Sequence, residues 1–399
     1  MKTTDNFFSK KRSWSKLKDE ILVSYLTPYL TKISYTRFPV IIADCFAGKG
    51  MFDDGQSGSP LYIAQAIKDF NQKSASKVDV QGVFVEKKYF KELQENLCSF
   101  MECKLIDSDY ENWAAKFVKE NRDQRWNLLL YVDPYGVKHL PFHHFQEIRL
   151  LDLNSIEILL NFNSFGFLRE GCRLLNLSDF ECNDDSDVYE QDEANSVPRM
   201  NAIANGNYWQ GILADYSNCK ISMKEAERIF SEAYINEMRD IFNFVINIPI
   251  KVKKSHLPKY RLVFCTNSED GLLLVADKMS RTWKGFVDRE RKGQQLLWEE
   301  IDFPDESSTG LAKPEEVIWD LLSTPIELKA LLVKLIEKYG ICYSESRLKE
   351  YCKKMEKDRE IIVTRDPSRT PTGKVSSSWE YKKYKIIIER GQSCQKNLL

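Results

Sequence analysis

Histidine is scarce in this chain, and the close cysteine spacings that hold metal ions are lacking. The 399 residues include four histidines and ten cysteines, and no two cysteines form a Cys-x-x-Cys pair. Zinc and iron–sulfur sites need closely spaced ligands, so we predict no metal site. The cysteines are expected to be reduced, and several of them buried in apolar runs, which is typical of an intracellular chain.

Long apolar runs and a leader are also lacking. No stretch approaches the roughly 18 apolar residues of a membrane span, and the N-terminus is polar, without the apolar segment of a signal peptide. The formal net charge is −1, so any nucleic-acid binding must come from a local basic patch. We therefore expect a cytoplasmic protein that makes no membrane contact.

Strands and helices alternate over the first half of the chain. Apolar runs predict five strands, at 39–44, 78–86, 103–107, 126–133 and 155–161, with helical spacing between them. Two further runs, at 245–250 and 260–266, predict an antiparallel edge pair. The central runs are almost uniformly apolar, which indicates an α/β fold with a parallel sheet covered on both faces.

Acidic residues end four of these strands, and a glycine-rich turn follows the first of them, Asp44-Cys45-Phe46-Ala47-Gly48-Lys49-Gly50. Glycine lets the backbone turn sharply and approach a ligand closely. An NAD site would need Gly-x-Gly-x-x-Gly at the start of a helix, but the next helix is predicted only from Ser59. The turn also lacks the Gly-Lys-Ser/Thr end of a phosphate-binding loop.

These features predict an S-adenosylmethionine site at the carboxyl ends of the strands, where open α/β sheets bind ligands. We expect Glu86 to accept hydrogen bonds from the two ribose hydroxyls. Asp109, or less well Asp107, would accept one from the adenine amino group. The predicted cofactor-binding residues are Asp44, Phe46, Gly48, Gly50, Glu86 and Asp109.

Asp133-Pro134-Tyr135-Gly136 ends the fourth predicted strand. Proline removes a backbone donor and holds the turn rigid, which leaves the Asp133 carboxylate and the Pro134 carbonyl as acceptors. Such acceptors could hold an exocyclic amine while its lone pair attacks a sulfonium methyl group. Asp133, Pro134 and Tyr135 are therefore the candidate catalytic residues; the alternative is a strand-ending turn with a packed tyrosine.

The composition changes towards the C-terminus. We predict a first domain at 1–292 with an acidic loop near 179–197, a linker at 293–312, a second domain at 313–390, and a tail at 391–399. Three short helices followed by two strands with a long polar tip predict a winged helix. Its candidate phosphate contacts are Lys353, Lys354, Lys357, Arg365, Arg369 and Lys374. A basic face used for protein contact is the alternative.

Several segments together resemble the three-Cys-motif partner family, TcmP. They are Trp14-Ser-Lys-Leu-Lys with Tyr25-Leu26, the turn from Asp44 to Gly50, Gly58-Ser-Pro60, Val85-Glu86, Asp133-Pro-Tyr-Gly and Asn161-Phe162. The resemblance covers about residues 7–290. It implies a Rossmann-like class I methyltransferase fold and partnership with a three-Cys-motif protein of the radical-SAM type.

The same motifs are similar to amino-methyltransferases that act on adenine in DNA or ribosomal RNA. Those enzymes carry Asp/Asn-Pro-Pro-aromatic, whereas this chain has Tyr135 third and Gly136 fourth, so stacking of Tyr135 on a base does not follow. Two functions therefore stand. One is a methyltransferase acting on an amino group of a nucleic acid or a partner protein; the other is a non-catalytic nucleic-acid-binding adaptor that keeps the fold.

Overall fold

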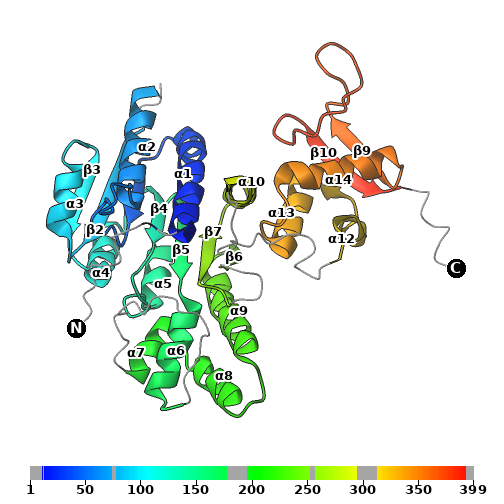
Figure 1. The fold of residues 1–399 in the computed structure, drawn as a ribbon. Coiled ribbons are helices and arrows are strands. Elements are labelled where there is room, and N and C mark those ends of the chain that lie inside the picture. The colour runs from blue at the N-terminus through cyan, green and yellow to red at the C-terminus, as the bar shows by residue number, and fades with distance from the viewer. Residues whose placement is uncertain are drawn as a thin grey trace. The chain divides into compact units, whose positions relative to one another are not determined.

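The computed structural model describes residues 11, 13–73, 78–177, 196–251, 257–293 and 312–391 (Figure 1). The chain forms two compact units. The first comprises Met1–Gly271 and Phe286–Asp302, and the second comprises Leu272–Gly285 and Phe303–Leu399. Most of the predicted acidic loop, linker and tail lies outside the described residues.

A seven-stranded sheet forms the centre of the first unit. Its strands are β1 (Val40–Asp44), β2 (Val80–Glu86), β3 (Cys103–Asp107), β4 (Asn127–Val132), β5 (Ser155–Phe162), β6 (Phe244–Ile250) and β7 (Tyr260–Thr266). Their order is β3-β2-β1-β4-β5-β7-β6, and β7 is antiparallel to both of its neighbours. This mostly parallel sheet confirms the predicted α/β class and is consistent with a Rossmann-like methyltransferase fold.

The helices of the first unit are α1 (Ser13–Ile33), α2 (Ser59–Lys73), α3 (Phe90–Leu97), α4 (Tyr110–Glu120), α5 (His143–Arg149), α6 (Ser164–Leu174), α7 (Val197–Ala204), α8 (Tyr208–Ser217) and α9 (Met223–Ile241). A further helix, α10 (Glu269–Gly293), has its ends in the first unit and its middle in the second. No helix in the described ranges combines the length and the apolarity needed to cross a membrane.

Both faces of the central strands are buried, as their uniform apolarity predicts. On one face Ile41, Leu128 and Leu130 belong to a core cluster shared with α4 to α9. On the other face the α1 residue Tyr25 packs edge-on against Phe264 of β7, with 5.8 Å between ring centroids. The strands therefore have helices on both sides, which is the arrangement that leaves their carboxyl ends as the place for a ligand.

The strand order reverses beside β1, which lies between β2 and β4. Asp44 pairs in register with Phe84 of β2 and Tyr131 of β4. In open α/β sheets ligands bind where the order reverses, outside the carboxyl ends of the strands. The turn after β1 and the turn after β4, which begins with Asp133, are therefore neighbours at the expected position.

The second unit is smaller. It contains α12 (Pro314–Leu321), β8 (Ile326–Glu327), α13 (Leu328–Tyr339), α14 (Glu345–Lys357), β9 (Ile361–Asp366) and β10 (Lys385–Arg390). The strands form an antiparallel sheet in the order β8-β10-β9. The three helices and two strands expected from the sequence are present. The two-residue strand β8 was not expected, because so short a segment has no periodicity.

Candidate functional site

The turn after β1 is fixed to both neighbouring strands. The Cys45 amide donates to the Tyr131 carbonyl of β4 at 2.9 Å, and the Ala47 amide donates to the Val85 carbonyl of β2 at 3.1 Å. Gly48 and Gly50 then take positive φ angles of 62° and 82°. Such angles favour glycine, so this sequence allows a sharp turn directly over the carboxyl edge of the sheet.

Glu86 ties this turn to the end of β2. Its Oε2 accepts a hydrogen bond from the Gly48 amide at 2.8 Å, and its Oε1 accepts from the amides of Lys87, Lys88 and Tyr89 at 3.1, 2.7 and 3.0 Å. Glu86 therefore lies beside the glycine turn, as the sequence predicts. Because Oε1 already accepts three amides, Oε2 is the oxygen with remaining capacity for a ribose hydroxyl.

Asp44 is completely buried at the end of β1. Its Oδ1 accepts from the Phe46 amide at 3.2 Å, whereas its Oδ2 has no hydrogen-bond partner among the described residues. Burial raises the pKa of Asp44 to about 7, the Ser59 hydroxyl and the Phe46 amide oppose that rise, and the carboxylates of Asp133 and Asp19 add to it. A cation placed beside Oδ2 would stabilise the ionised form.

The raised pKa of Asp44 predicts a pH-dependent stability. The unfolded pKa is about 3.9, so between that pH and about 7 the folded state binds more protons and the free energy of unfolding falls as pH rises. We expect Asp44→Asn to flatten this fall and to be more stable than the wild type at pH 8 by about 1–3 kcal/mol. Denaturant titrations at pH 5 and pH 8 measure it.

A control variant for this prediction is Asp152→Asn. Asp152 is exposed and forms a surface ion pair with Arg125 at 3.5 Å. Its removal should leave the difference in unfolding free energy between pH 5 and pH 8 as in the wild type. An Asp44→Asn variant with the wild-type difference would show that the Asp44 carboxyl does not titrate in this range.

Asp133 is surrounded by donors from three elements. The Lys18 ammonium of α1 donates to Oδ1 at 2.9 Å and to Oδ2 at 2.7 Å. Asn161 of β5 donates to Oδ1 at 2.6 Å, and the Tyr131 hydroxyl donates to Oδ2 at 3.3 Å. Asp133 therefore lies at the predicted edge of the sheet with both oxygens engaged. Sequence reasoning did not assign Lys18 or Asn161 to the site, although both lie in the segments that resemble TcmP.

A second buried ion pair lies at the start of the described chain. The Lys11 ammonium pairs with Asp19 and donates to the Ser57 carbonyl at 2.6 Å. It also lies 4.9 Å from the centroid of the Tyr62 ring. Burial raises the pKa of Asp19 to about 6, against the opposing charge of Lys11. The N-terminal segment thus supplies two ammonium groups, Lys18 to Asp133 at the end of β4 and Lys11 to Asp19 in α1.

The rest of the turn after β4 differs in exposure from residue to residue. Pro134 is buried, and no described residue donates a hydrogen bond to its carbonyl. Tyr135 is 40% exposed. The Phe46 ring lies 5.4 Å from the Tyr110 ring, centroid to centroid, so Phe46 packs onto the start of α4. The Pro134 carbonyl is the acceptor that remains available beside Asp133.

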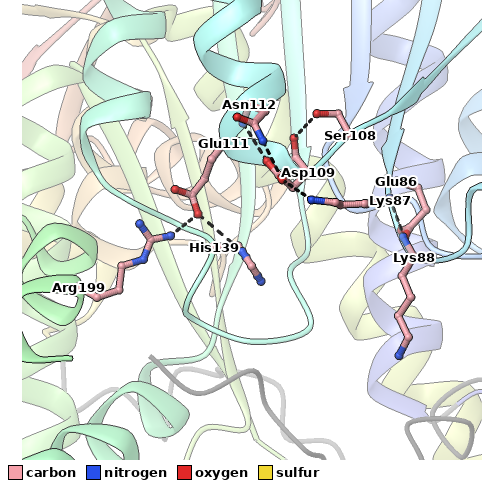
Figure 2. Close-up of polar contacts among 9 residues, drawn as sticks. All are labelled: Glu86, Lys87, Lys88, Ser108, Asp109, Glu111, Asn112, His139 and Arg199. Atoms are coloured by element: carbon pink, nitrogen blue, oxygen red, sulfur yellow. Dashed lines mark hydrogen bonds and ion pairs between the residues drawn. The ribbon is translucent and has the colours of Figure 1, made fainter. Parts of the chain in front are cut away.

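Asp109 has a structural role that the sequence prediction did not assign to it. It is the N-cap of α4: Oδ1 accepts from the Asn112 amide at 2.9 Å, and Oδ2 accepts from the Asn112 side chain and the Lys87 ammonium at 2.9 and 3.0 Å (Figure 2). Burial acts to raise the pKa of Asp109, but these donors outweigh it and the pKa is lowered. Because Oδ1 accepts only one hydrogen bond from the described residues, the role of Asp109 as acceptor for an adenine amino group stays a prediction.

A polar cluster forms around Glu111, two residues after Asp109. Glu111 pairs with Arg199 of α7 and lies 3.6 Å from Nδ1 of His139, and Figure 2 shows its carboxylate between these two side chains. Arg199 also donates to the Lys138 carbonyl from Nε at 2.8 Å. These contacts anchor the loop between β4 and α5 to α7, and none of them was predicted.

The candidate nucleic-acid ligands of the second unit fall into two groups. Lys353, Lys354, Lys357, Arg369 and Lys374 are exposed. Arg365 is buried instead: it forms a bidentate pair with Glu356, with 2.8 Å for each bond, and lies 5.3 Å from the Trp379 ring centroid. Arg365 therefore holds the hairpin to α14 and is not available to a phosphate.

Comparison with known proteins gives little further information. The sequence matches no family model and no curated protein. Two spermidine synthase structures show partial similarity. One, in complex with the transition-state analogue AdoDATO, has 7% identity and a TM-score of 0.32, covering 67% of this chain. The other, from Thermotoga maritima, has 8% identity and a TM-score of 0.30, covering 65% of this chain.

The chain spans 65% and 60% of the lengths of those two structures. Similarity at this level says nothing about the activity of this chain. The description of the fold therefore rests on the strand order and register of this chain.

Proposed function

We propose that the first unit binds S-adenosylmethionine at the carboxyl ends of β1, β2 and β4 and transfers its methyl group to an amino group. The main support is the turn at Gly48, where a positive φ angle and the hydrogen bond to Glu86 hold the backbone over the sheet edge. Beside it, Oδ2 of buried Asp44, which no described residue contacts by a hydrogen bond, favours a cationic ligand. S-adenosylmethionine has both a sulfonium and an ammonium group.

The turn after β4 would hold the accepting amine. The Pro134 carbonyl and one oxygen of Asp133 accept hydrogen bonds from it, so its lone pair points at the methyl carbon. S-adenosylmethionine would supply the methyl group: a nitrogen–carbon bond would form as the sulfur–carbon bond breaks, which would leave a neutral thioether. The nitrogen would lose a proton to solvent. Because Lys18 bonds both oxygens of Asp133, the incoming amine must share or replace one of these bonds.

Calorimetry with S-adenosylmethionine and S-adenosylhomocysteine tests the proposal. We expect saturable binding of both by the wild-type chain, and absence of binding would overturn the proposal. Transfer of a labelled methyl group to total RNA, to DNA and to a three-Cys-motif protein then identifies the acceptor. The resemblance to TcmP motivates that partner, and a cytoplasmic setting accords with the reduced cysteines.

The second unit would act as a winged helix that contacts nucleic acid. Three helices with a three-stranded antiparallel sheet support this proposal, as does the exposure of Lys353, Lys357 and Lys374. These lysines lie at the end of α14 and in the segment between β9 and β10. Cationic side chains at such positions contact phosphates, which position a protein on the duplex without specifying sequence.

Exposed lysines of this unit should determine the salt dependence of nucleic-acid binding. We expect Lys357→Ala and Lys374→Ala each to reduce the slope of log K against log salt by about 1, because each phosphate contact releases counterions. Fluorescence anisotropy with a duplex of mixed sequence at several salt concentrations measures the slope. Lys116→Ala, an exposed lysine of α4 in the other unit, is the control and should keep the wild-type slope.

A non-catalytic adaptor is the second candidate function. The observation that favours it is the saturation of Asp133, whose oxygens accept bonds from Lys18, Asn161 and Tyr131. In that case the chain would bind the cofactor or nucleic acid without transfer. Transfer of the labelled methyl group by the wild type, with loss of that transfer in an Asp133 variant, would exclude the adaptor function.

A further inference from the structure

Three of the chain's four histidines lie within six residues, at 139, 143 and 144. They follow the turn after β4 and reach into the first turn of α5. Among the described residues, His143, His144 and Glu147 form a group whose ligand atoms all lie within 4.8 Å of one another. This local gathering contrasts with the scarcity of histidine elsewhere, and neither the cofactor site nor the proposed transfer uses it.

One distance in this group agrees with that between two ligands of one ion. The His144 Nδ1 lies 3.3 Å from the Glu147 Oε2. Zinc bonds of about 2.0–2.1 Å in tetrahedral geometry place two ligand atoms roughly 3.3 Å apart. His144 is 4% exposed and packs edge-on against Tyr110, so its ring direction is set by the core. His143 is exposed and one helical turn from Glu147, so its ring can rotate towards the same point.

We propose that His143, His144 and Glu147 bind a divalent transition-metal ion of the zinc class, with a fourth position left open. Two imidazoles and one carboxylate are a ligand set that zinc accepts. This proposal is independent of the methyltransferase proposal, since none of its ligands belongs to the cofactor or amine site.

Bound metal would hold together the first turns of α5, the helix that ends the loop after β4, because all three ligands lie in α5. The loop starts at Asp133 and is already fixed in the middle by the bonds from Arg199 to the Lys138 carbonyl. A metal ion would hold the helix at the far end of this loop in place, because ligand bonds leave little freedom to the groups that make them. The expected effect is a higher midpoint of thermal unfolding in the presence of the ion.

Titration of the full-length, chelator-treated chain with Zn²⁺ and with Co²⁺ tests the proposal. We expect one equivalent to bind, and we expect His143→Ala to weaken binding at least about tenfold and Glu147→Gln to weaken it less. His143 is exposed, so its replacement should leave the far-UV circular dichroism spectrum unchanged. His139→Ala is the matched control, because it removes a nearby imidazole outside the group and should keep the wild-type affinity.

Cobalt spectra distinguish this site from binding by thiols. Cys98 and Cys219 are exposed and could bind soft metals. Ligation by imidazole and carboxylate gives weak visible bands, whereas thiolate ligation gives intense charge-transfer absorption. Absence of binding, thiolate bands that His143→Ala leaves unchanged, or equal affinity in the His143→Ala variant would each overturn the proposal.

Discussion

Replacing Asp133 by asparagine is expected to lower the rate of methyl transfer by at least about 100-fold, the scale seen when one stabilising group at a reacting centre is removed. Asparagine keeps the shape and one acceptor, but the negative charge that orients the amine is lost. Binding of S-adenosylhomocysteine should change less than about threefold, because Asp133 is assigned to the amine and not to the cofactor. Single-turnover transfer and calorimetry on the same preparations measure the two effects.

The asparagine variant is preferred to alanine because of Lys18. The Lys18 side chain is 8% exposed, and removal of its partner would leave a buried ammonium unpaired, which costs about 3–5 kcal/mol in well-buried pairs and less here because Asp133 is 25% exposed. Asp152→Asn is the activity control, since it lies away from the carboxyl ends of the strands. Full transfer by Asp133→Asn would refute the role given to this carboxylate.

Gly48→Arg is the second change with a large expected effect, and it should weaken binding of S-adenosylmethionine by at least about 100-fold. Gly48 has a φ of 62°, and its amide donates to Glu86, so a side chain there strains the backbone and fills the space over the sheet edge. Calorimetry with S-adenosylmethionine measures the loss. Thermal unfolding of the same variant shows whether the fold is kept.

Gly55→Arg is a control that distinguishes the effect of backbone strain from the effect of a side chain that fills the cofactor site. Gly55 has a comparable φ of 79°, but a Cβ there would meet no atom within 4 Å. The backbone strain is therefore similar in the two variants, whereas only Gly48 lies beside Glu86. We expect Gly55→Arg to bind the cofactor as the wild type does. Equal loss in both variants would mean that strain alone accounts for the effect at Gly48.

The strand ends could be predicted from the sequence because their signals are local. Apolar runs set the strands, and the spacing from Asp44 to Gly50 sets the turn, so both were placed without knowing any distant contact. The bond between Lys18 and Asp133 joins residues 115 positions apart. No periodicity or motif specifies such a pair, and only the packing of α1 against the sheet brings them together.

Two residues show that one local signal can have a second meaning. Asp109 is predicted to bind the cofactor, and an aspartate just before a helix with asparagine three residues later is also an N-cap. Arg365 is predicted to contact phosphate from the wing, but the structure buries it. Alternation along β9 places it on the same face as Ile361, which is buried, and that period of two was the available signal for its burial.

The position of α1 has a consequence for the choice of expression fragments. A fragment that starts at Phe38 would contain every strand of the sheet and the whole Asp44–Gly50 turn. It would nevertheless uncover the apolar surface that Leu17, Ile21 and Leu22 bury, and it would leave Asp133 without its ammonium partner. Such a fragment would be insoluble or inactive for reasons unrelated to its cofactor turn. A cofactor-binding assay on a fragment whose boundary follows the strand pattern alone would therefore give a misleading negative result.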